Sequence, residues 1–122
     1  MRTTKKDFER CEKSFRLWQG RLSLMEWRAC FEHGKVTDAY AEIFANPEGR
    51  IATVIFADAC STDGAIGYDP VHTGRHEALE LLLAPLKEIA RARNFSEADL
   101  DAAIHAVIRR LENLFDGMEG NG

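Results

Sequence analysis

Cysteine is scarce in the sequence, and its spacing excludes two common kinds of small protein. The 122-residue chain has three cysteines, Cys11, Cys30 and Cys60, and no two of them form a C-x-x-C pair. Distant cysteines in odd number give neither a disulfide framework nor a zinc knuckle. We therefore expect three free thiols that are mostly buried.

A long apolar segment is also missing. A membrane-spanning helix needs about 20 consecutive apolar residues, and no segment of the chain approaches that length. The basic start, residues 1–6, is not followed by the apolar core of a signal peptide. We therefore expect a cytoplasmic protein with no membrane partner.

Positive charge is in deficit as well. The chain has 16 Lys and Arg residues against 20 Asp and Glu residues, which gives a formal net charge of −4. This balance disfavours binding to nucleic acid by bulk electrostatics, so no nucleic-acid partner is expected. The arginines of the last part of the chain, among them Arg109 and Arg110, leave a small nucleic-acid-binding accessory protein as a further alternative.

The composition is that of one ordinary globular domain. Hydrophobic residues make up 45% of the chain and charged residues 30%, which is enough apolar material for a single core. We expect one domain over residues 1–122, with flexible ends at about residues 1–4 and 116–122.

The spacing of apolar residues predicts a helix followed by three strands. The helix is expected over residues 5–19 and the strands over 27–33, 38–46 and 50–57. The Asn-Pro-Glu-Gly sequence at 46–49 is a strong turn signal and predicts a hairpin with a four-residue loop. Three consecutive strands joined in this way predict an antiparallel sheet.

The second half of the chain is expected to be helical after a surface loop over residues 58–73. Asp69 or Thr73 is expected to cap the next helix, which Pro85 should kink or divide. A last helix is expected from about 96 to 115. This order predicts an α+β fold in which the helices cover one face of the small sheet.

The helix after the loop begins with His76-Glu77-x-x-Glu80. Residues four apart on a helix are neighbours, so the His76 ring and the Glu80 carboxylate can converge on one ion. The motif differs by one residue from His-Glu-x-x-His, in which two histidines hold zinc and the glutamate is the general base. A carboxylate is also a competent zinc ligand. The residues expected on the buried side of this helix are Leu79, Leu82, Leu83, Leu86 and Ala90.

Plainer interpretations of these residues stay open. His76 and Glu80 are also what an exposed hydrogen-bonded helical pair looks like, and Glu77 also suits the positive end of the helix dipole. His72, four residues before His76, would extend the row of ligands, but we place it at the junction between loop and helix. His105 in the last helix has the alternative of an ordinary half-exposed histidine.

The chain resembles a group of short phage and prophage proteins that look like minimal zincin-type metallopeptidase domains. The likeness covers nearly the whole chain, from Trp18 and Trp27 through the hairpin to the motif helix. It implies a zinc site with His76 as first ligand, Glu77 as general base and Glu80 in the place of the second histidine. His105 is the candidate third ligand. Two histidines and one carboxylate also suit iron(II) or manganese.

From this resemblance we expect a metal-dependent hydrolase of the peptidase kind, acting on a peptide or protein substrate. The alternative is a zincin-like scaffold without catalytic activity that serves as a phage structural or partner-binding protein. The apolar last helix is compatible with pairing of two copies.

Overall fold

The computed structural model describes residues 1–61 and 67–120, and within them it confirms an α+β fold. Its elements are α1 (Lys5–Arg21), β1 (Arg28–Gly34), β2 (Ala41–Asn46), β3 (Ile51–Ala57), α2 (Pro70–Leu82), α3 (Ala84–Arg91) and α4 (Glu97–Gly120). None of the described helices combines the length and the apolar character needed to cross a membrane.

The sheet is mixed, and the expectation of three antiparallel strands is wrong. β3 lies in the middle, antiparallel to β2 and parallel to β1. The four-residue hairpin loop is confirmed, because Asn46 pairs with Ile51. β3 is the most apolar strand, so a central position with a strand on each side buries most of its surface. The segment between β1 and β2 therefore passes the end of β3 before β2 begins.

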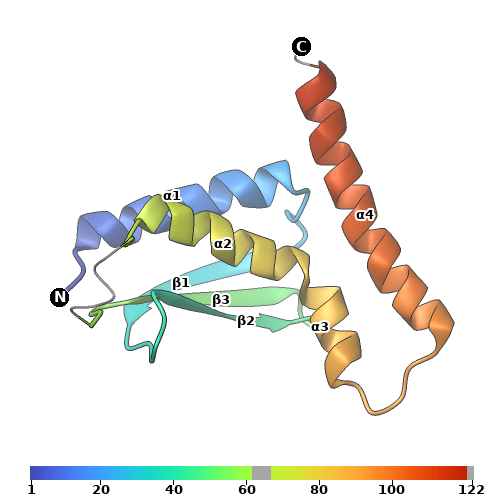
Figure 1. Cartoon of the computed structure of the whole chain (residues 1–122), viewed down its shortest axis with the longest axis horizontal. Helices are drawn as coiled ribbons and strands as arrows, with labels where there is room; N and C mark the ends of the chain where they lie inside the picture. Colours follow the sequence, from blue (N-terminus) through green and yellow to red (C-terminus); the bar gives the residue numbers. More distant parts are fainter. Residues whose placement is uncertain (62–66, 121–122) are drawn as a thin grey trace.

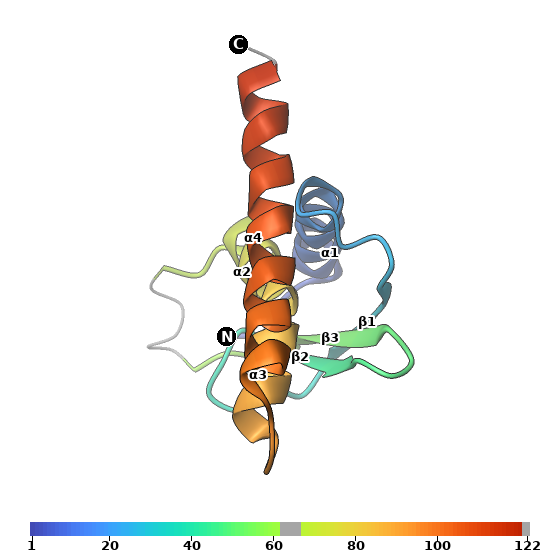
Figure 2. The same cartoon turned by 90° about the vertical axis from the view of Figure 1, so that its right-hand side faces the viewer.

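Two helices cover one face of this sheet. Figure 1 shows α1 and α2 above the three strands, and Figure 2, turned by 90°, shows them side by side on that face. α3 continues from the end of α2, and α4 turns back along it and extends past the rest of the molecule. The opposite face of the sheet carries exposed side chains such as Cys30 and Phe44.

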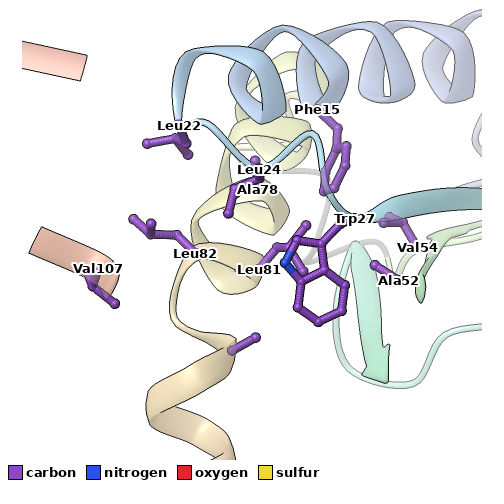
Figure 3. Close-up of a cluster of buried hydrophobic side chains, with 11 residues drawn as sticks. Phe15, Leu22, Leu24, Trp27, Ala52, Val54, Ala78, Leu81, Leu82 and Val107 are labelled. Atoms are coloured by element: carbon purple, nitrogen blue, oxygen red, sulfur yellow. The ribbon is translucent and has the colours of Figure 1, made fainter. Parts of the chain in front are cut away.

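The main core lies between the helix pair and the sheet. Phe15 of α1, Val54 of β3 and Leu81 of α2 are almost fully buried there, and Trp27 closes the end nearest α3. Figure 3 shows how these side chains converge from different elements. The three cysteines are free, but Cys11 alone is buried, so the expectation of mostly buried thiols holds for one of them.

α1 and α2 pack at unusually close range because of Gly74. A Cβ atom at this position would lie 2.9 Å from the Phe15 nitrogen and closer still to the Cys11 carbonyl oxygen. Nearby, the Ser14 hydroxyl donates a hydrogen bond of 2.6 Å to the Val71 carbonyl. The absence of a side chain at Gly74 therefore fixes how near α2 comes to α1.

α2 begins earlier than expected. The predicted loop over 58–73 is shorter, because the Asp69 carboxylate accepts from the Val71 and His72 amides and caps a helix that starts at Pro70. Residues 62–66 of that predicted loop lie outside the described residues. His72 consequently belongs to the first turn of the helix.

The buried side of α2 is also different from the prediction. Leu82 is buried as expected, but Leu79 and Leu83 are about 40% exposed. Gly74 and Ala78 instead face α1 and the sheet, and Glu77 shares their side. The run from 78 to 84 is apolar except for Glu80, and its leucines are too many for periodicity alone to choose the inner face.

The division near Pro85 is confirmed: α2 ends at Leu82 and α3 begins at Ala84. In α4, Val107 is buried, whereas Ile108 and Phe115 of the expected core stripe are about half exposed. α4 is longer than predicted and reaches Gly120, while residues 121–122 of the predicted tail lie outside the described residues.

The amino-terminal end is held in place and was not expected to be. The amino group of Met1 donates to the Cys60 carbonyl at 2.8 Å, and the Thr3 hydroxyl donates to the Ala57 carbonyl at 2.6 Å. The Thr4 side chain then caps α1 in a capping box with Asp7.

Candidate functional site

A pocket of about 840 Å³ opens between α2 and the segment that leads into β2. Its wall on the α2 side is formed by His72, Thr73, His76 and Glu77. The opposite wall is formed by the loop before β2 and by the start of that strand. The segment after β3 also lines the pocket. The described residues on those two sides include Val36, Asp38, Ala39, Tyr40, Ala41, Ala59, Cys60 and Ser61.

Glu77 is the buried acidic group of this pocket. The residue is only 5% exposed, although it carries a carboxylate. Burial raises the pKa of Glu77 from 4.5 to about 7, the His76 and Lys87 charges lower it in part, and Glu80 raises it further. At neutral pH this carboxyl group therefore exchanges a proton readily, as a general acid or base must.

His76 and Glu80 do lie together, as their spacing predicted. The His76 Nε2 is 3.6 Å from the Glu80 Oε1, with 59% and 34% of the two side chains exposed. The second Glu80 oxygen accepts a hydrogen bond from the Lys87 ammonium of α3. Lys87, seven residues after Glu80 and across the helix division, is not among the residues expected at this site.

His105 does not join them. It lies on the exposed side of α4, where its Nδ1 is 2.7 Å from the Asp101 carbonyl oxygen of its own helix. The Arg109 guanidinium donates to the His105 carbonyl at 3.3 Å. These local contacts are those of an ordinary exposed helical histidine.

The three expected metal ligands consequently do not meet. Among residues 1–61 and 67–120, no group of three or more His, Cys, Asp or Glu side chains is arranged to hold a metal ion. His76 and Glu80 supply two donors, and one Glu80 oxygen is already engaged by an ammonium group. The residues as placed do not fit a three-ligand zinc, iron or manganese site.

The pocket also includes residues outside the expected set of metal ligands. His72 faces the pocket from the first turn of α2, and its Nδ1 is 3.1 Å from an Arg75 nitrogen. The four-residue spacing from His76 is the sequence signal for His72, and the start of α2 at Pro70 places both residues on one helix, contrary to the expected loop. Tyr40 and Ser61 gave no local signal, since only the tertiary fold brings their segments opposite α2.

Comparison of the chain with protein-family models, with curated proteins and with solved structures gave no match. The resemblance to the phage metallopeptidase-like group therefore stays a prediction. The site has to be interpreted from its own geometry.

Proposed function

We propose that this chain is a peptidase-like domain whose pocket between α2 and β2 receives an extended peptide, with Glu77 as its acid–base group. The observation that carries the proposal is the position of Glu77, a buried carboxylate in the pocket wall beside His76. Burying a carboxylate is costly, and such groups cluster at functional sites.

An extended peptide suits the surroundings of the pocket. β2 is an edge strand, since the described sheet has the order β1-β3-β2. Its first residue, Ala41, lies at the pocket. An exposed strand edge offers backbone hydrogen bonds to a peptide that adds as a further strand, and a volume of about 840 Å³ is in the range of ligand pockets.

Glu77 would serve hydrolysis by accepting a proton from a water molecule that attacks a peptide carbonyl, and by returning it to the departing amine. Acid–base catalysis of this kind contributes roughly 10²–10⁴-fold, which is less than most enzymes achieve. The metal-dependent form of the hypothesis requires His76, Glu80 and His105 at one ion. Since these residues do not fit that ion as placed, we derive no step through it.

A second candidate is a zincin-like domain that binds a peptide segment of a partner without cleaving it, as a phage structural or partner-binding protein. The ion pair between Glu80 and Lys87 supports this candidate, because it satisfies the carboxylate that a metal would need. Both candidates share the pocket and differ in the chemistry at Glu77.

One experiment separates them. Internally quenched decapeptides of mixed sequence are incubated with wild type, Glu77→Gln and the control Glu9→Gln, an exposed position on α1. Each is tested with EDTA and with added zinc, iron(II) or manganese, and fluorescence anisotropy measures binding. Cleavage that is lost in Glu77→Gln and kept in Glu9→Gln supports the hydrolase. Binding without cleavage supports the second candidate, and neither binding nor cleavage contradicts both.

The remaining expectations belong to the same proposal. We expect the domain to act in the cytoplasm and without nucleic acid. Ile108, Phe115 and Met118 leave part of α4 apolar and exposed, which suits pairing of two copies. Sedimentation equilibrium of wild type against Ile108→Asn tests that pairing.

A further inference from the structure

Glu80 is held from two sides by groups of different helices. His76, one turn earlier on α2, lies 3.6 Å from one carboxylate oxygen, and Lys87 of α3 donates to the other. Each Glu80 oxygen thus has a partner within the protein, and the Glu80 side chain is 34% exposed. The carboxylate therefore has a cationic partner within the protein.

The position of Lys87 follows from the division of the helix. α2 ends at Leu82, Leu83 begins the next turn, and the Lys87 amide donates to the Leu83 carbonyl at 3.0 Å. Lys87 is thus one turn into α3, with its side chain 40% exposed. Figure 1 shows α3 continuing from the end of α2, and across this division the Lys87 ammonium contacts the Glu80 carboxylate.

The charges around Lys87 explain what it does there. α2 contributes His76, Glu77 and Glu80, and the edge strand β2 contributes Glu42, whose charge also acts on Glu77. Among residues 1–61 and 67–120, Lys87 is the lysine whose charge lowers the pKa of Glu77. Without it, the Glu80 carboxylate would lose its ammonium partner and Glu77 would lose the positive charge that lowers its pKa.

We propose that the Lys87 ammonium is the resident cation of this site: it holds the place beside His76 and Glu80 that a divalent metal ion would need, and so keeps metal ions out. A metal ion bound to Glu80 would lie within a few ångströms of the ammonium group, where like charges repel strongly because screening is incomplete. It would also have to break the ion pair between Glu80 and Lys87.

Zinc titration by calorimetry tests this inference on the full chain without a polyhistidine tag, after EDTA treatment, at pH 7.5. The parents are wild type and Glu80→His, which restores the His-x-x-x-His spacing. In both parents, Lys87→Met should raise the zinc association constant at least tenfold, an order-of-magnitude value for a removed neighbouring charge. In wild type it also frees the Glu80 carboxylate from its ion pair. Lys87→Arg keeps the charge and should leave the association constant unchanged. The control Lys13→Met removes an exposed lysine of α1 and should also have no effect.

The inference is overturned if Lys87→Met changes zinc affinity less than about twofold in both parents, tenfold being the expected effect. A failure to detect zinc in any variant counts as that result. Circular dichroism and urea unfolding check that each variant is folded. The titration contains no peptide, so its failure is distinguishable from failure of the proposed peptide binding at the same pocket.

Discussion

Replacing Glu77 by glutamine should make the protein more stable at alkaline pH and leave it nearly unchanged at acid pH. Glu77 is 5% exposed, and burial raises its pKa from 4.5 to about 7. The folded protein therefore prefers the neutral carboxylic acid, which glutamine resembles in size and charge. Wild type has to carry the buried charge above pH 7, whereas Glu77→Gln does not.

The magnitude follows from the change in pKa between the two states. A rise from 4.5 to about 7 corresponds to about 3 kcal/mol between the protonated and charged forms. Between these two pH values the folded state binds more protons than the unfolded state, so the free energy of unfolding falls as pH rises. This contribution is complete below about pH 4.5, is lost progressively up to about pH 7 and is constant above it.

Urea unfolding of wild type and Glu77→Gln at intervals between pH 4.5 and 8.5 measures the effect. The difference in unfolding free energy, variant minus wild type, should grow by about 3 kcal/mol across that range in favour of the variant. Effects of the other carboxylates cancel because both proteins share them. Glu9→Gln, whose side chain is 62% exposed, should show a flat difference. A flat difference for Glu77→Gln as well would refute the assignment of Glu77 as a buried acid with a raised pKa.

Three further predictions concern packing and caps. Gly74→Ala should lower the free energy of unfolding by 2 kcal/mol or more as an order of magnitude, since its Cβ would meet the α1 backbone, and Gly20→Ala is the control. With nothing within 4 Å of its Cβ, Gly20→Ala should stabilise the helix by about 0.5–1 kcal/mol; equal effects of both in thermal melts would contradict the close approach. Thr4→Ala should lower the free energy of unfolding by about 1 kcal/mol because it removes the capping box of α1. Urea unfolding measures this loss, with Thr53→Ala on the open sheet face as the control. Asp69→Ala should lower the free energy of unfolding by a similar amount because it removes the cap of α2. An unchanged urea midpoint would show that Pro70 suffices to start the helix.

The predictions that held depend on local chemistry. Asp69 caps α2, as predicted, because a side-chain oxygen needs only the amides two or three residues away. The helix division at Pro85 follows from the missing N–H of one residue, and the hairpin loop from four consecutive turn residues. His76 and Glu80 meet because they are one helical turn apart.

The predictions that failed depend on which elements become neighbours. The expectation of an all-antiparallel sheet was wrong because β1 pairs in parallel with β3 and not with β2. Local sequence does not decide which strand takes the central place, and here it goes to β3, the strand with most apolar surface to bury. The buried face of α2 was wrong because leucines surround that helix, and Gly74 against α1 decides its rotation.

The sequence by itself determined where helices and strands lie, where they are capped or broken, and that an imidazole and a carboxylate share one side of α2. These features are set by residues within about one helical turn or one hairpin of each other. Only the tertiary structure decided that Glu77 is turned inward, that Lys87 neutralises Glu80, and that His105 stays on the exposed side of α4. The reason is physical: packing fixes how each helix is rotated about its axis, and that rotation decides which ionisable groups lose water and which keep it.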